Sequence, residues 1–219
     1  MNRGPDGDAL RYFGLYPAIV TDIVDPKSLG RIQVKFPWLG SDGTDVRAWS
    51  TLIMPYADDD QGYEMLPSVD TQVVVAFEAG ELRRPYIVGA CWNGVESLPE
   101  SPSQPNNKRL IKSRAKSLLE FDDTEGAAKV TLSMQSGHKV VLDDSAQQVQ
   151  FTHSNGCSIT MNAAGQIQIT ANSTVEITAP AVNVHAAAAN FDGIVNCTTV
   201  ICSSGVVSPM YTPGAGNIW

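Results

Sequence analysis

Short apolar runs separated by turn residues recur through the first half of the chain. In residues 31–36, Ile32, Val34 and Phe36 alternate with charged or amide side chains, which is the period-2 pattern of a half-buried strand. Five such runs in about 80 residues are typical of a small closed β-barrel. The strands are expected at residues 16–24, 30–36, 48–53, 71–77 and 85–89.

A different pattern begins at Val130, where pairs of apolar residues separated by one position recur as far as Val184. Turn-type residues lie between the pairs, and the step from one pair to the next becomes shorter toward the C-terminus. Each pair predicts one short strand with two side chains on the same face. The pairs are Val130/Leu132, Val140/Leu142, Val149/Phe151, Ile159/Met161, Ile167/Ile169, Val175/Ile177 and Val182/Val184.

Strands this short cannot enclose a core within one chain. A rung of a single-chain β-solenoid takes about 20 residues or more, whereas each repeat here provides one strand. Three chains around a threefold axis would each form one wall of a triangular prism, with the paired residues pointing inward. The expected fold is therefore all-β, with a C-terminal intertwined triple-stranded β-helix whose trimer core consists of these pairs.

Charge is distributed unevenly along the chain. The net charge of −8 argues against nucleic acid as a ligand, because phosphate binding depends on clustered Lys and Arg. All 15 Lys and Arg lie at or before Lys139, so the segment 140–219 contains none. Residues 98–107 are proline-rich and predict a linker. Residues 108–116 contain five bases, but acids follow from Glu120, which favours a charged joint over a phosphate-binding patch.

Candidate chemistry is sparse. The sequence contains no nucleophile elbow, HExxH motif or glycine-rich phosphate loop, so no catalytic residue is assigned and no enzyme is expected. His185 stands alone and, by alternation, points outward, which favours a surface histidine over a metal ligand. Cys197 and Cys202 are expected to fill space where the repeat loses regularity, and a threefold thiol site is the less favoured alternative. No cofactor or metal site is predicted, although an axial metal ion stays open.

The tryptophans and the N-terminus add little to this picture. Trp38, Trp49 and Trp92 are interpreted as core or subunit packing in preference to base stacking, because acids such as Asp58 and Asp59 lie nearby. No apolar run approaches the roughly 20 residues of a membrane span, and the N-terminus lacks the apolar core of a signal peptide. Synthesis in the cytosol is therefore expected.

Three segments together resemble a known family. Residues 24–38 (VDPKSLGRIQVKFPW), 48–49 (AW) and 85–89 (PYIVG) resemble the oligonucleotide/oligosaccharide-binding (OB) barrel of the phage baseplate assembly protein V family, a module also found in type VI secretion spikes. The resemblance implies a barrel that trimerises and seats the spike on a hub. Residues 118–126 and 136–144 resemble the start of the needle in these spikes, and residues 211–219 resemble the end of many phage members.

The sequence also departs from some members of this family. It lacks the HxH element with which some of them hold a metal at the tip, and its short linker leaves no room for a cell-wall-cutting domain. The hub-like domains that precede the barrel in type VI spikes are not present, so the hub is expected to be a separate chain.

The expected organisation is an N-terminal arm (1–11), an OB-fold barrel (12–97), a linker and joint (98–117), a triple-stranded β-helix needle (118–204) and a C-terminal tip segment (205–219). The tip segment is predicted to form the tip or to receive a separate PAAR-repeat tip protein. Its candidate residues are Tyr211, Pro213, Ile218 and Trp219.

The resulting hypothesis is a structural, homotrimeric central spike of a contractile phage tail or phage-tail-like particle, assembled in the bacterial cytoplasm. Its expected partners are a trimeric hub at the barrel, a PAAR-type tip protein, and transiently the target outer membrane, which it would pierce when the sheath contracts. Two alternatives stay open. One is a tail-associated spike that binds or degrades polysaccharide, and the other is an OB-fold nucleic-acid-binding module with an oligomerising tail.

Overall fold

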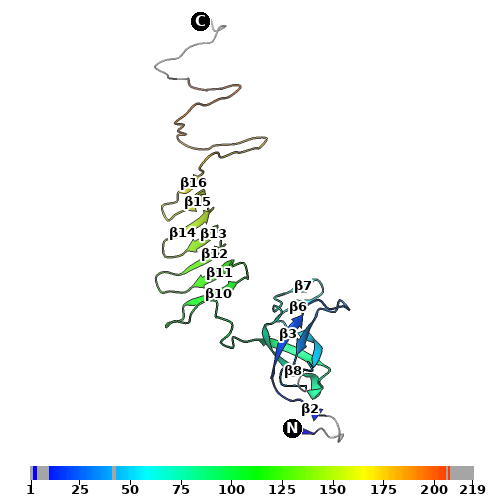
Figure 1. Cartoon of the computed structure of the whole chain (residues 1–219). Coiled ribbons are helices and arrows are strands. Elements are labelled where there is room, and N and C mark those ends of the chain that lie inside the picture. Colours follow the sequence, from blue (N-terminus) through cyan, green and yellow to red (C-terminus); the bar gives the residue numbers. More distant parts are fainter. Residues whose placement is uncertain (1, 4–9, 41–42, 206, 208–219) are drawn as a thin grey trace. The chain divides into compact units, whose positions relative to one another are not determined.

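The computed structural model of the chain describes residues 2–3, 10–40, 43–205 and 207 (Figure 1). Its regular structure in these ranges is all β apart from one short 3₁₀ helix, η1 (Glu78–Gly80). The chain divides into two units, residues 1–170 and residues 171–219. The first unit contains a closed barrel and, after it in the chain, a seven-stranded sheet.

The barrel consists of β3 (Tyr16–Asp22), β4 (Arg31–Lys35), β5 (Arg47–Leu52), β8 (Gln72–Phe77) and β9 (Pro85–Ala90). The strands close in the order β3-β4-β5-β9-β8. All neighbours are antiparallel except β5 and β9, which pair in parallel at Thr51 with Tyr86 and Leu52 with Ile87. The closed five-strand barrel predicted from the alternating runs is therefore present.

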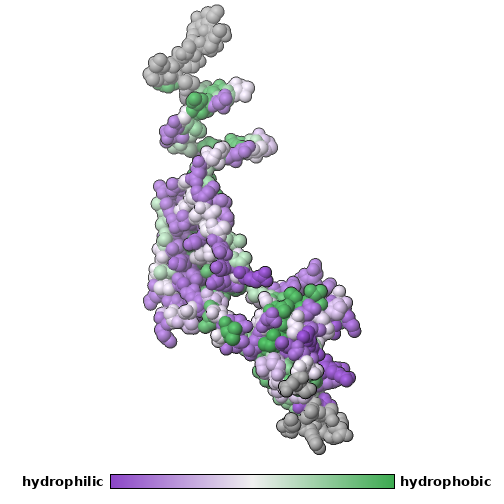
Figure 2. Space-filling model, viewed as in Figure 1, coloured by the Kyte–Doolittle hydropathy of each residue, from purple (hydrophilic) through white to green (hydrophobic). Residues whose placement is uncertain are grey.

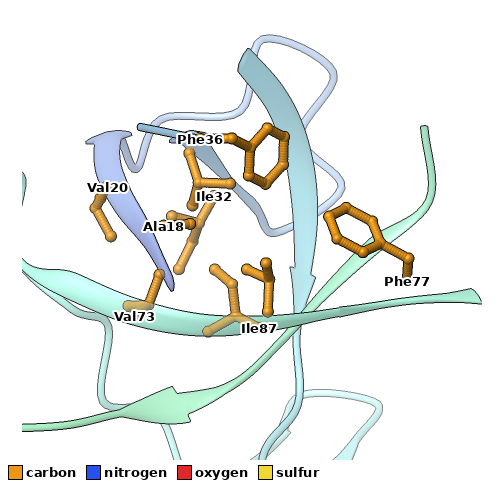
Figure 3. Packing of buried hydrophobic residues seen from close by; sticks show 9 residues of the cluster. Ala18, Val20, Ile32, Phe36, Val73, Phe77 and Ile87 are labelled. Atoms are coloured by element: carbon orange, nitrogen blue, oxygen red, sulfur yellow. The ribbon is translucent and has the colours of Figure 1, made fainter. Parts of the chain in front are cut away.

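The core of the barrel follows from the alternation. In β4 and β8 every second side chain is buried, because successive residues of a strand point to opposite faces. Figure 3 shows these side chains meeting inside the barrel from β3, β4, β8 and β9. The buried apolar residues are Ala18, Val20, Ile32, Val34, Phe36, Val73, Val75, Phe77 and Ile87.

An aromatic cluster packs against this core. The rings of Trp38 and Tyr16 stack with centroids 4.7 Å apart, and Trp38 Nε1 donates a hydrogen bond of 2.8 Å to the carbonyl of Pro17. Tyr12 and Phe77 also contact Trp38. Trp49 lies beneath the guanidinium of Arg31, 5.7 Å from ring centroid to Cζ. Trp38 thus packs against the core as predicted, Trp49 contacts Arg31, and Trp92 is 61% exposed.

Two short hairpins accompany the barrel. One joins β1 (Asn2–Arg3) to β2 (Leu10–Arg11). The other joins β6 (Ala57–Asp58) to β7 (Gln61–Gly62), with the acidic residues 58–60 at its turn. Asp60 has a φ of 52°, in the left-handed region that Asp tolerates better than most residues.

The seven-stranded sheet is an antiparallel meander in which each strand pairs with the next along the chain. Five-residue turns connect several strands, and those at 134–138, 153–157 and 162–166 each place a glycine at positive φ. The strands are β10 (Lys108–Lys112), β11 (Leu118–Asp122), β12 (Lys129–Ser133), β13 (Lys139–Asp143), β14 (Gln148–Thr152), β15 (Ser158–Met161) and β16 (Ile167–Thr170).

The sheet differs from the sequence expectation at both ends. Its first strand, β10, lies in the basic stretch that was expected to be a joint, and it pairs fully with β11. After Thr170, the described part of the second unit (171–205 and 207) contains no strand, although pairs such as Val175/Ile177 predicted strands there. The pattern of apolar pairs thus continues beyond the point where the chain pairs with itself.

Candidate functional site

The register of the meander sorts its side chains onto two different faces. Val140 lies opposite Leu132 and Phe151, and Leu142 lies opposite Val130 and Val149. The predicted apolar pairs on β12 to β16 all fall in two adjacent columns on one face of the sheet, which we call the apolar face. The first column is Ile111, Leu119, Leu132, Val140, Phe151, Ile159 and Ile169, and the second is Arg109, Phe121, Val130, Leu142, Val149, Met161 and Ile167.

The apolar face is largely exposed to water. Nine of its large side chains are between 39% and 67% exposed, whereas Leu119, Val130, Val140 and Val149 are half-buried. The opposite face, which we call the polar face, holds Glu120, Thr131, Gln150 and Thr160, and these residues are only half-buried. Much of the sheet surface visible in Figure 2 is hydrophilic. A contiguous apolar surface of this size on one side of a sheet is typical of an interface.

A shallow groove of about 560 Å³ lies at one edge of the sheet. Phe121, Val130, Leu142 and Val149 of the second column line it, together with residues of the turns at 123–128 and 144–147. The apolar face is therefore indented along this edge, where large side chains of another surface would fit.

Arg109 is the one charged member of the two columns. Its Nη1 donates hydrogen bonds to the carbonyls of Asn106 (2.6 Å) and Lys108 (2.9 Å). These bonds turn the guanidinium toward the backbone of its own chain. The apolar face therefore ends at β10 with a charge that is partly satisfied locally.

Opposite charges alternate along one column of the polar face. Lys108 lies opposite Asp122, Asp122 opposite Lys129, and Lys129 opposite Asp143. The Thr124 hydroxyl and N–H lower the pKa of Asp122, and the Ala146 N–H and Ser145 hydroxyl lower that of Asp143, with the lysines contributing to both shifts. Both carboxylates are thus held in their charged form, which suits a water-facing surface.

The linker is tied to the first strand of the sheet. Lys108 Nζ lies 2.9 Å from Glu100 Oε1, and Lys112 Nζ donates a hydrogen bond of 3.2 Å to the carbonyl of Pro99. Hydrogen bonding to Glu100 and the charge of Glu120 raise the pKa of Lys108. The basic stretch therefore makes contacts within its own chain, and two of its residues hold the linker.

Metal-binding and catalytic groupings do not emerge from the residues that the structure describes. Within these ranges, no three His, Cys, Asp or Glu residues lie close enough together to hold a metal ion. His138 and His153 do meet, with ring centroids 4.3 Å apart, and the Nδ1 of each accepts a backbone N–H. His185 is exposed in the second unit. No helix in the described ranges is both long and apolar enough to cross a bilayer.

The barrel carries a second apolar surface. A groove of about 480 Å³ lies beside the β6–β7 hairpin and is lined by Ile23, Leu52, Tyr56, Tyr63 and Leu66 among others. Several large side chains around it are exposed, and Figure 2 shows hydrophobic residues gathered on the barrel surface. This groove is a second candidate docking surface.

The predicted core residues divide between the two units. The pairs from Val130/Leu132 to Ile167/Ile169 share the apolar face, whereas Val175, Ile177, Val182 and Val184 are exposed in the unpaired second unit. The predicted tip residues Tyr211, Pro213, Ile218 and Trp219 lie outside the described residues.

Three apolar residues extend the face beyond the predicted set: Ile111, Leu119 and Phe121. Leu119 and Phe121 have the same spacing as the predicted pairs, so the pattern could have been followed further back. Ile111 lies in the basic stretch 108–116, with Leu110 before it and Lys112 after it, and the density of bases there obscured the strand.

Comparison with known proteins agrees with this architecture. The model of one family, described as the type VI secretion system/phage-baseplate injector OB domain, matches residues 16–92, which span the barrel. The type VI secretion system spike protein VgrG3 of Vibrio cholerae serotype O1 (El Tor Inaba N16961) is 22% identical over 129 residues, which are 56% of this chain and 13% of that protein.

A second relative is the actin cross-linking toxin VgrG1 of Vibrio cholerae serotype O1 (Classical Ogawa 395), which is 21% identical over 137 residues. These cover 59% of this chain and 12% of that protein. The chain thus spans about an eighth of the length of either relative, and the likeness concerns that region.

Proposed function

This chain belongs to the baseplate spike family through the injector OB domain at residues 16–92, and on that premise we propose that it is the trimeric central spike of a contractile phage tail or phage-tail-like particle. Its role would be mechanical. The barrel would dock on a separate trimeric hub, and the needle would be driven through the target outer membrane when the sheath contracts.

The exposed apolar face of the seven-stranded sheet carries this proposal. Fully burying one large apolar side chain stabilises a structure by about 1.5–3 kcal/mol, so two columns of such side chains exposed to water represent a large unused free energy. Three copies around one axis would turn all three faces inward and bury them together. The charged and amide side chains of the polar face would then form the outside of the prism.

The second unit supports the same arrangement. Val175, Ile177, Val182 and Val184 repeat the apolar pairing, but the step from Val175 to Val182 is shorter than any step between pairs within the sheet. The described residues after Thr170 form no strand, so the chain does not pair these apolar residues with itself. Residues 171–204 would instead pair with neighbouring chains. This would produce the intertwined, triple-stranded part of the needle.

The proposed spike has two further contacts, one with a hub protein at the barrel and one at the tip. The apolar groove beside the β6–β7 hairpin is the surface of the barrel best suited to a hub protein. At the other end, residues 205–219 would form the tip or receive a PAAR-type tip protein. No catalytic step is part of the proposal.

The decisive experiment is the mass of the native full-length chain by light scattering, with resistance to SDS without heating as a companion. We expect a mass three times that of the 23.5 kDa chain. A monomer at micromolar concentration would contradict the proposal, because the apolar face would then be exposed to water in the native protein.

A further inference from the structure

The two margins of the apolar face differ in chemistry. The strand register continues one residue pair beyond the strands on each side, as the hydrogen bonds from Met134 N to His138 O and from Asp144 N to Ala128 O show. One margin, the histidine edge, consists of Ser113, Ser117, Met134, His138, His153 and Cys157. The other margin, the aspartate edge, consists of Asn107, Asp123, Ala128 and Asp144, followed by the turn residues Gln147 and Ala163.

Each strand from β10 to β14 is flanked by one residue of each edge, whereas Ala163 lies two residues beyond the end of β15. His138, Val140, Leu142 and Asp144 alternate along β13, so all four point to the apolar face. His138 and Asp144 are six residues apart in an extended segment, which separates them by about 20 Å. They cannot touch within one chain.

A closed threefold assembly brings unlike edges together. Threefold symmetry rotates one copy onto the next without translation, so the same strand lies at the same height in every copy. When three sheets close into a prism, the histidine edge of one wall meets the aspartate edge of the next. We infer that the protomers of the proposed trimer join along these two edges with equal strands in register, so that His138 of one protomer contacts Asp144 of its neighbour.

The side chains on equal strands are complementary. On β13 an imidazole would meet a carboxylate, and on β14 His153 would meet an amide, Gln147. On β12 the large Met134 would meet the small Ala128, and on β15 Cys157 would meet Ala163. On β10 Ser113 would meet Asn107, and on β11 Ser117 would meet Asp123.

A shift by one strand in either direction destroys this match. Met134 would then face a carboxylate, Asp123 or Asp144, which would be desolvated against a thioether. A shift in one direction would place His138 opposite Ala128, and a shift in the other would place His153 opposite Ala163. Each shift therefore leaves one histidine without a polar partner. The edges therefore match best when equal strands meet, in addition to the apolar face that drives association.

A single substitution tests the register. Ala163→Cys places a thiol on the aspartate edge of β15, opposite Cys157 of the neighbouring protomer. Gln147→Cys places one on β14, where Cys157 would reach it only in a shifted register. Either new thiol lies about 20 Å from Cys157 of its own chain, beyond the roughly 7 Å between Cα atoms that a disulfide spans. Any disulfide between Cys157 and the new thiol must therefore join two chains.

After mild oxidation of the full-length chain, we expect Ala163→Cys to run as a covalent trimer on non-reducing SDS gels after heating. The parent chain and Gln147→Cys should run as single chains. A covalent trimer from Gln147→Cys alone, or none from an Ala163→Cys chain that has trimeric mass, would overturn the edge pairing and leave the proposed function standing. A parent chain of monomeric mass would instead overturn the proposed function, on which this inference rests.

A second measurement decides the matter if Ala163→Cys fails to assemble. His138→Ala and Asp144→Ala are compared singly and together by the temperature at which the trimer dissociates. Sites about 20 Å apart in one chain give additive losses unless they touch in the assembly. We expect the double variant to lose clearly less than the sum of the single losses, and additive losses would contradict the contact.

Discussion

At the scale of single residues, Asp25 shows how a short sequence motif organises a loop. Its carboxylate accepts hydrogen bonds from Nε and Nη2 of Arg31 at 2.8 and 2.9 Å and from the backbone N–H groups of Lys27 and Leu29. Its side chain is only 2% exposed. Gly30 follows with a φ of 67°, a left-handed conformation that favours glycine. The Asp-Pro and Gly-Arg residues of the family resemblance thus close the loop between β3 and β4.

We predict that Asp25→Asn lowers the thermal stability of the barrel, because an amide cannot accept the paired hydrogen bonds of the guanidinium and leaves that charge unpaired. Arg31 holds the pKa of Asp25 well below its usual range, so the carboxylate stabilises the fold at every pH above the usual Asp value. That stabilisation is lost as the pH falls through the lowered pKa. The Tm difference between parent and variant should therefore be constant from pH 5 to 7, values chosen about a unit or more above the usual Asp pKa, and shrink in stronger acid.

Asp45→Asn is the matched control for Asp25→Asn. Asp45 also pairs with an arginine, at 2.9 Å from Arg47 Nη2, but both side chains are about half exposed. Exposed ion pairs contribute about 0–1 kcal/mol, so this variant should change the Tm little. Equal losses in the two variants would show that the loop does not depend on Asp25 specifically.

The sequence predicted which residues are buried where strand alternation determines burial. It did not predict the environment of single polar side chains whose contacts depend on the fold. Ile32, Val34 and Phe36 are buried as expected, because their neighbours point outward along the same strand. The sequence placed Asp25 in the family resemblance but did not predict its contacts, since its partners lie up to six residues away and depend on the loop conformation. Ser50, buried in β5, carried no sequence signal at all.

At the scale of elements, the two faces of the seven-stranded sheet should respond oppositely to charge. Phe151→Lys places an ammonium group on the apolar face, whereas Gln150→Lys changes the neighbouring residue on the polar face. Losing a buried Phe side chain costs about 3–5 kcal/mol, and burying an unpaired charge adds to that cost. We expect Phe151→Lys to abolish the trimer in light scattering and Gln150→Lys to retain it. Retention of the trimer by both variants would contradict burial of the apolar face.

A second prediction at this scale concerns the end of the meander. The strands up to Thr170 pair within one chain, whereas the described residues after it form no strand. A chain ending at Thr170 should still form a trimer by mass, because its apolar face is complete. It should lose resistance to SDS, which we attribute to intertwined strands. A monomeric truncated chain would show that residues 171–219 are needed for association itself.

The limits of the sequence pattern at this scale have a physical cause. The wider spacing of the pairs from Val130 to Ile169 accommodates a strand and a tight turn, so these pairs lie on strands of the meander. The same apolar pairing continues after Thr170, where the step from Ile167 to Val175 equals the step from Ile159 to Ile167, yet the described residues there form no strand. Apolar pairs therefore indicate which side chains need burial, but their spacing alone does not decide whether the partner strand comes from the same chain.

At the scale of the whole molecule, the absence of Lys and Arg from the segment 140–219 bears on penetration. In the proposed spike, the outside of residues 171–204 is mostly Ser, Thr, Asn and Ala, with Glu176 and Asp192 as its acids. Charged side chains are costly at the centre of a bilayer, at about 2.5–3.5 kcal/mol each for Lys. Moving a needle with few charges across the bilayer therefore requires less desolvation work.

We therefore predict that Thr178→Lys combined with Asn183→Lys leaves assembly intact but impairs delivery. Thr178 follows Ile177 and Asn183 lies between Val182 and Val184, so both alternate outward from the apolar pairs. A trimer would carry six additional ammonium groups, and their desolvation would oppose entry of the needle. Light scattering should give an unchanged trimeric mass, while infection, killing or secretion by the assembled particle should fall. The matched control is Thr178→Gln combined with Asn183→Gln, which adds similar bulk without charge. Lysine particles as active as the glutamine particles would show that the needle crosses the membrane without its outer surface being desolvated.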